Sequence, residues 1–95
     1  MAAPGFIDNA AARRYELPFD GHVAVIAYRD TPAGARIFLH TEVPAAMNGR
    51  GFGSALVKAA LDDVRARGLT VIPSCPFVRA YIDRHPEYAE LLAKP

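Results

Sequence analysis

The segment that most constrains the fold of this chain is a glycine-rich stretch followed by a long run without glycine or proline. The stretch reads Asn48-Gly49-Arg50-Gly51-Phe52-Gly53-Ser54, and neither residue type returns until Gly68. Glycine permits a positive φ and has no Cβ to keep a ligand away from the backbone. The first N–H groups of a helix have no partner within it, and its dipole favours an anion there. The pattern therefore predicts a phosphate-binding loop at the start of a helix.

Two common nucleotide-binding patterns do not fit this loop. The Walker pattern requires a lysine directly before Ser or Thr, whereas Ser54 follows Gly53. The dinucleotide pattern requires G-x-G-x-x-G after the first strand of a β-α-β unit. Here the spacing is G-x-G-x-G, and several strand candidates come first. We therefore expect a phosphate loop of another type.

Composition narrows the class of protein. The chain has 95 residues and a net charge of +1. We expect one small domain over residues 1–95 and no nucleic-acid partner, since nucleic-acid binding relies on clustered Lys and Arg. No apolar run approaches the roughly 20 residues of a membrane span, and the first five residues lack the features of a secretion signal. We therefore expect no membrane partner. The single cysteine excludes an internal disulfide, so we expect a cytoplasmic protein.

Three strands are predicted before the glycine loop. Residues 13–19 and 22–28 have strand-like patterns, and Asp20-Gly21 between them is typical of a tight hairpin turn. Residues 1–12 show little periodicity and are expected to form a loose lead-in. The third strand, residues 35–43, is expected to place alternate side chains on opposite faces. One face would carry Ile37, Leu39, Thr41 and Val43, and the other Arg36, Phe38, His40 and Glu42. The short connections predict an antiparallel three-stranded meander.

Further elements are predicted after the loop. An apolar stripe with helical spacing indicates a helix over residues 52–67, formed by Leu56, Ala60, Leu61 and Val64. Residues 69–73 are short and apolar, which is typical of a buried strand parallel to a neighbour. Pro76 suits the first position of a second helix, and Pro86 ends it before one last short helix. The expected fold class is α/β (α+β), with helices packed on a mixed sheet.

Cys75 is a candidate catalytic residue because it would be the N-cap of the second predicted helix. The unpaired N–H groups and the dipole at a helix N-terminus favour a thiolate and lower the pKa of the thiol. Such a thiol can accept an acyl group from a thioester or protonate a leaving thiolate. The alternative is a small buried apolar side chain at a strand end, which is how most free cysteines behave.

His40 and Glu42 are candidates for contact with a substrate amine. They share one face of the third predicted strand, about 7 Å apart, because the strand rise is about 3.4 Å per residue. An amine is mostly protonated at neutral pH, and a base must remove a proton before it attacks. His40 suits that task, while Glu42 can act through water or hold the ammonium. The alternative is that both side chains simply face solvent.

Several motifs together resemble a known family. The segment from Val43 to Val57 resembles the acetyl-CoA pyrophosphate loop of the GNAT superfamily of N-acetyltransferases, which reads Arg/Gln-x-x-Gly-x-Gly/Ala. Gly51 and Gly53 match that pattern, while Asn48 stands where Arg or Gln is usual. Other motifs follow in the family's order: His40-Thr41-Glu42-Val43-Pro44, Pro73-Ser74-Cys75-Pro76-Phe77-Val78 and His85-Pro86-Glu87-Tyr88. The chain, roughly from Asp8 to Leu92, is similar to the single-domain subfamily sometimes called YidJ-like or Acetyltransf_CG, which has a minimal GNAT-like fold.

The resemblance implies an acetyl-CoA-dependent N-acetyltransferase that releases CoA and acts on an amine of a small molecule or a protein. It implies that Cys75 is catalytic near the thioester, and that Tyr81 matches a tyrosine near the coenzyme sulfur, a possible general acid. A core tyrosine is the alternative, because the family's Tyr-x-Lys-x-Gly-Phe continuation is missing. No metal site is expected. Besides Cys75, the coenzyme would contact Glu42, Val43, Asn48, Gly49, Arg50, Gly51, Phe52, Gly53 and Ser54.

Two other functions remain open on the sequence. One is a non-catalytic module that binds CoA or acetyl-CoA, or an interaction partner, since a truncated fold leaves little wall for an acceptor pocket and a fold does not imply activity. The other is a phosphate-binding domain unrelated to CoA, which tight nucleotide binding without dependence on pantetheine would favour.

Overall fold

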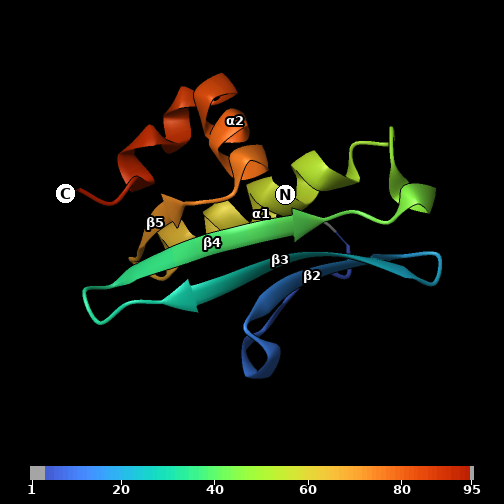
Figure 1. Cartoon of the computed structure of the whole chain (residues 1–95), viewed down its shortest axis with the longest axis horizontal. Coiled ribbons are helices and arrows are strands. Elements are labelled where there is room, and N and C mark those ends of the chain that lie inside the picture. Colours follow the sequence, from blue (N-terminus) through green and yellow to red (C-terminus); the bar gives the residue numbers. More distant parts are fainter. Residues whose placement is uncertain (1–3, 95) are drawn as a thin grey trace.

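The computed structural model describes residues 4–94 and contains a five-stranded sheet with helices packed against it (Figure 1). Met1–Ala3, at the start of the predicted lead-in, lie outside the described residues, as does Pro95. The elements, with η marking short 3₁₀ helices, are β1 (Ile7–Asn9), η1 (Ala10–Ala12), β2 (Arg14–Phe19), β3 (His22–Asp30), β4 (Ala35–Glu42), η2 (Ala45–Met47), α1 (Phe52–Ala66), β5 (Thr70–Pro73), α2 (Pro76–Arg84) and η3 (Pro86–Leu91).

The sheet has the strand order β1-β2-β3-β4-β5. Neighbouring strands from β1 to β4 are antiparallel, and β5 runs parallel to β4. The predicted meander is therefore present as β2, β3 and β4, and the expected mixed sheet of the α+β class is confirmed. The predicted hairpin turn is also confirmed, because Asp20 and Gly21 adopt positive φ values of 50° and 78° between paired Phe19 and His22.

The expectation of a loose lead-in over residues 1–12 is wrong for β1 and η1. β1 pairs with β2 through Ile7 opposite Glu16 and Asn9 opposite Arg14. The chain reverses between these strands because the Asn9 side chain accepts a 3.2 Å hydrogen bond from the Ala12 N–H. Three residues are too few to show a strand period, so only the pairing partner makes this segment a strand.

A β-bulge changes the predicted faces of β4. His40 lies opposite Ala27 and Phe38 lies opposite Tyr28, so Leu39 is an extra residue on β4. A bulge shifts the alternation by one residue. As a result Phe38 and Thr41 point to the same side of the sheet, which corrects the expectation of a regular alternation along residues 35–43.

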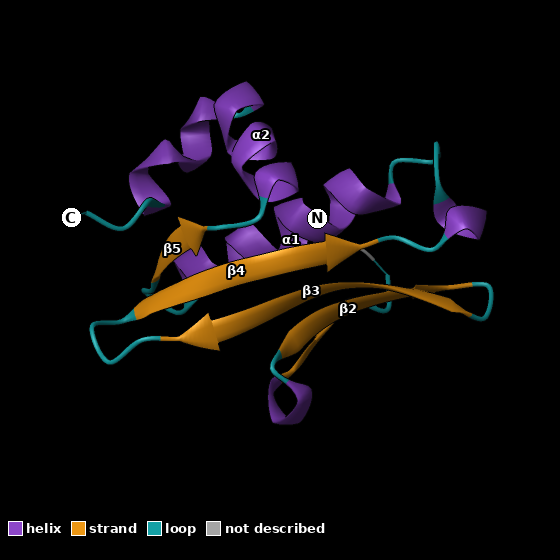
Figure 2. Ribbon diagram, viewed as in Figure 1, coloured by secondary structure: helices purple, strands orange, loops and turns teal. Residues whose placement is uncertain are grey.

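Both α-helices lie on one side of the sheet (Figure 2). α1 presents the predicted apolar stripe, extended by Val57, to a core that includes Tyr15, Ile26 and Phe38, all fully buried. Excluding such side chains from water is the main stabilising contribution to the fold. Neither α1 nor α2 covers the opposite side of the sheet in Figure 2, and Val23 and Leu39 there are exposed. None of the described helices is both long and apolar enough to span a bilayer.

A buried arginine joins elements at the end of the sheet far from the glycine loop. Arg36, on β4, is only 6% exposed and donates to both carboxylate oxygens of Asp30, at 2.6 and 3.0 Å. It also donates to the Tyr15 hydroxyl at 2.8 Å. Burial alone would lower the pKa of Arg36, but these hydrogen bonds raise it above its ordinary value. The charge is therefore paired within the fold, and we assign this cluster to structure.

The position of the site follows from where β4 and β5 part. Their pairing covers only Ala35–Phe38 opposite Thr70–Pro73. Pro73 ends β5, and one last hydrogen bond joins the Cys75 N–H to the Phe38 carbonyl at 3.0 Å. Beyond it the chain turns into α2, while β4 continues to Glu42. The sheet therefore opens between the second half of β4 and the start of α2.

Candidate active site

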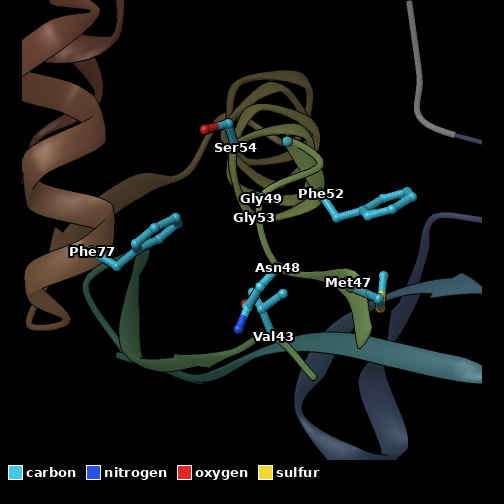
Figure 3. Close-up of a pocket in the computed structure, with 9 residues that line it drawn as sticks. Val43, Met47, Asn48, Gly49, Phe52, Gly53, Ser54 and Phe77 are labelled. Carbon is cyan, nitrogen blue, oxygen red and sulfur yellow. The ribbon is translucent and has the colours of Figure 1, made fainter. Parts of the chain in front are cut away.

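The glycine loop forms a cavity of about 190 Å³ at the start of α1 (Figure 3). Gly51 is the N-cap of α1 with a φ of 79°, a left-handed conformation that glycine adopts without strain. Val43, directly after β4, Met47, at the end of η2, and Phe77, in the first turn of α2, complete the lining. The cavity therefore lies where β4, α1 and α2 meet.

The first turn of α1 presents free hydrogen-bond donors. Its first backbone hydrogen bond joins the Ala55 N–H to the Gly51 carbonyl at 3.0 Å, and no side chain caps the helix. Within the described residues, the N–H groups of Phe52, Gly53 and Ser54 thus have no acceptor from the protein. Three such donors, with the positive end of the helix dipole, suit the oxygens of a phosphate group.

Most of the residues expected to bind the coenzyme do line this cavity. They are Val43, Asn48, Gly49, Gly51, Phe52, Gly53 and Ser54. Arg50 does not line it, because its guanidinium lies over the Phe19 ring, 5.0 Å from the ring centre. Glu42 and Cys75 are also outside the lining. Their contact with the coenzyme therefore stays a prediction, and it would be made at the opening between β4 and the start of α2.

Cys75 is the N-cap of α2, as the sequence predicts, and is 4% exposed. Its Sγ lies 3.4 Å from the Thr41 hydroxyl oxygen. Burial alone would raise the pKa of the thiol, but the Thr41 hydroxyl and the backbone N–H groups of Val78 and Phe77 lower it more. The net pKa of Cys75 lies below its ordinary value. The thiolate of Cys75 therefore forms more readily than that of a free cysteine.

His40 and Glu42 lie together, on the opposite side of the sheet from Thr41. Their side chains approach within 3.6 Å, and both are more than half exposed. Their strand partners, Ala27 and Val25, alternate with Ile26, which pairs with Thr41 and faces the core. The structure therefore brings the two predicted bases together but separates them from the Cys75 side of β4.

Tyr81 is packed into the helical layer. It is 4% exposed, stacks on His85 with 4.1 Å between ring centres and lies near Tyr88. Burial raises the pKa of its hydroxyl. These contacts join α2 to η3, and none of them reaches Cys75. A core role accounts for the position, and the acid role of Tyr81 stays a prediction.

Sequence reasoning missed two residues of this region, Thr41 and Phe77. Thr41 was assigned to a strand face by regular alternation, and the bulge at Leu39 leaves no local pattern in one sequence. For Phe77 the sequence predicts a place on the apolar face of the second helix, yet the side chain is 41% exposed and lines the loop cavity. An aromatic residue directly after a helix-starting proline was the available signal, and periodicity alone could not interpret it.

A loop with free helix N–H groups, a parted sheet and a capping thiol together define an α+β fold of the GNAT type. A family model described as GCN5-related N-acetyl-transferase matches residues 14–91. The chain therefore belongs to this family. The resemblance inferred from the motifs is confirmed.

Two further comparisons agree with the family assignment. Two curated relatives, Protein NATD1 from Homo sapiens and from Mus musculus, are each 42% identical to this chain. Each match extends over 55 residues, which is 56% of this chain. The chain spans about half the length of these curated relatives, since the match covers 49% and 50% of them. The NMR solution structure of a GCN5-like protein from Staphylococcus aureus matches with a TM-score of 0.73 and 23% identity. That match covers 100% of this chain and 93% of the other, which confirms the fold.

Proposed function

We propose that this chain transfers an acetyl group from acetyl-CoA to an amine. The observation that carries the proposal is the meeting of two helix N-termini beside the sheet opening. The α1 terminus offers the unpaired N–H groups of Phe52, Gly53 and Ser54, and the α2 terminus offers Cys75 with a lowered pKa. The N–H groups at the α1 terminus suit a pyrophosphate, and the thiol at the α2 terminus suits the sulfur chemistry of a thioester.

The residues at the site fit acetyl-CoA, which supplies the activated acetyl thioester. The glycine loop would hold the pyrophosphate through the three N–H groups. Past Phe38, the edge of β4 that faces β5 pairs with no strand of the described residues, while the other edge stays paired with β3. Its backbone amides can therefore bind the amides of the pantetheine arm, as an added strand would. This arm would lead from the loop towards the Cys75 thiol.

The chain's own residues would divide the chemistry between the two sides of the sheet. Cys75 acts at the thioester in one of two ways. Its thiolate takes the acetyl group onto Sγ and releases the CoA thiolate, and the amine then takes the acetyl group from Sγ and frees the Cys75 thiolate. Alternatively, the amine attacks the thioester directly, and the Cys75 thiol gives its proton to the departing CoA thiolate. Because β4 and β5 are paired only as far as Phe38 and Pro73, the proposal has the amine approach through this opening from the His40 and Glu42 side. Glu42 holds the ammonium, and His40 removes its proton before attack.

A transfer assay tests this function. Acetyl-CoA is mixed with the full chain and with amines of several classes, namely a lysine peptide, a peptide with a free N-terminus and a polyamine. CoA release and the product masses are then followed. We expect transfer to at least one class. Acetyl-CoA binding without transfer to any amine would instead support the non-catalytic coenzyme-binding module.

Cys75→Ala and Cys75→Ser test the proposed thiol chemistry. Because removal of an acid or base group typically costs 10²–10⁴ in rate, we expect Cys75→Ala to transfer at least about 100-fold more slowly. Acetyl-CoA affinity should stay within about twofold in both variants, since the sulfur lies outside the phosphate cavity. An acetyl adduct of the wild-type chain that is absent from Cys75→Ser would identify the covalent route. Equal transfer rates would remove Cys75 from the mechanism.

A further inference from the structure

Phe77 is an exposed aromatic ring that projects from α2 into the loop cavity. It occupies the second position of the helix, is 41% exposed and lines the cavity with Val43 and Gly53. Figure 3 shows its ring pointing towards the start of α1, while Phe52 lies on the other side of the loop. A large apolar side chain with this exposure has one face available for a ligand.

The ring position depends on the absence of a side chain at Gly53. A Cβ built at Gly53 would lie 2.9 Å from Cζ of Phe77 and 3.3 Å from its Cε2, closer than real Cβ contacts. The same Cβ would lie 3.4 Å from Cγ2 of Val43. Phe77 and Val43 therefore pack closely around the first turn of α1, one from α2 and one from directly after β4.

Phe77 lies next to two chemically different parts of the site. Its ring packs against Gly53, whose N–H group is unpaired within the described residues, as is that of Ser54. Its backbone N–H bonds the Cys75 thiol, two residues earlier in the chain. A ligand that extends from the phosphate cavity to the thiol therefore runs alongside Phe77.

We infer that Phe77 is a specificity-determining residue that contacts the pantetheine arm and makes the site selective for pantetheine thioesters over nucleotides. The inference rests on the proposed function. ADP has the pyrophosphate but no arm, so in the cavity lined by Phe77 it would cover less of the ring than a ligand that also extends towards Cys75. The pantetheine arm carries methyl and methylene groups that gain from contact with an apolar surface.

Calorimetric titration of the full chain with acetyl-CoA and with ADP tests the inference. We expect Phe77→Ala to weaken acetyl-CoA binding about tenfold and ADP binding less than about twofold, because the arm of acetyl-CoA would cover much more of the ring than the pyrophosphate alone. Phe77→Tyr keeps the ring and should keep the wild-type ratio of the two affinities. Gly53→Ala should lower that ratio, because the added methyl group displaces the ring.

Phe19→Ala is the matched control, because Phe19 is also a partly exposed ring near the loop, 38% exposed and 4.5 Å from the Phe52 ring centre. It should leave the affinity ratio unchanged. If Phe77→Ala weakens the binding of acetyl-CoA and of ADP equally, or weakens neither, the inference is overturned. The proposed function would still stand in that case, provided that the wild-type protein binds acetyl-CoA. Wild-type protein that binds neither ligand would overturn both.

Discussion

At the scale of single residues, Thr41 connects an irregularity of the sheet to the proposed chemistry. The extra residue Leu39 turns Thr41 towards the helical side of β4, where its hydroxyl lies 3.4 Å from Cys75 Sγ. A hydroxyl donates to a thiolate more favourably than to a thiol, so it lowers the pKa of the sulfur. With a regular strand the hydroxyl would face the open side, and the thiol would lose this partner.

Replacing Thr41 by Val should raise the pKa of Cys75 towards its ordinary value. The wild-type pKa is lowered, so the thiolate should form at a lower pH in the wild type than in the variant. The measurement is the ultraviolet absorbance of the thiolate against pH, with Cys75→Ser as the blank. Thr31→Val is the control, because the Thr31 hydroxyl bonds the Ala35 N–H and not the thiol. A superimposable curve for Thr41→Val would contradict the assigned role of Thr41.

The residue scale also shows what one sequence can predict about a site. The position of Cys75 followed from Pro76, whose fixed φ and missing N–H suit the first helical residue, and the loop glycines followed from their spacing. Thr41 depended on the bulge, and the exposure of Phe77 depended on Gly53 across the gap between two helices. Both are consequences of tertiary packing, so no local pattern contains them.

At the scale of elements, Asp8 joins the short strand β1 to the rest of the fold. Its carboxylate accepts a hydrogen bond from the Tyr28 hydroxyl of β3 and lies 3.4 Å from Arg36 of β4. It also lies 3.2 Å from Arg67, which follows α1. The side chain is only 10% exposed. Three residues of strand pairing hold β1 weakly, so this carboxylate is a large part of its attachment.

Asp8→Asn should lower the free energy of unfolding by about 1–3 kcal/mol, because it removes the charge that faces two arginines and leaves the buried Arg36 with one partner fewer. Urea unfolding measures the change. Glu90→Gln is the control, since Glu90 pairs with Arg65 at 3.2 Å with its side chain 73% exposed, and exposed pairs contribute at most about 1 kcal/mol. Equal stability of Asp8→Asn and wild type would contradict the structural role of Asp8.

Helices and strands were predictable from the sequence where their residue pattern was long. The prediction failed where pairing with a neighbouring strand determines the structure. The apolar stripe of α1 runs from Leu56 to Val64, about two and a half turns. β2 and β3 are joined by a turn whose residues favour positive φ. β1 has three residues and is fixed by its partner β2 and by Asp8. The bulge in β4 likewise depends on its register with β3.

At the scale of the whole molecule, the two ends of β4 have different tasks. Arg36 and its acidic partners hold the sheet together at one end. The glycine loop, the Cys75 thiol and the His40–Glu42 pair surround the other end, about 20 Å away along the strand. Both α-helices lie on one side of the sheet, so in the proposed function the acceptor would approach from the other side, at the point where β4 and β5 part.

The most direct test of the central claim, that the loop at the start of α1 binds acetyl-CoA, is an amide NMR titration of the ¹⁵N-labelled full chain. The amide signals of Phe52, Gly53 and Ser54 should shift most and saturate at micromolar acetyl-CoA, a binding free energy of about −8 kcal/mol. Signals near Arg36 should stay in place. Saturating shifts elsewhere, or none at millimolar acetyl-CoA, would contradict the coenzyme site and with it the proposed function.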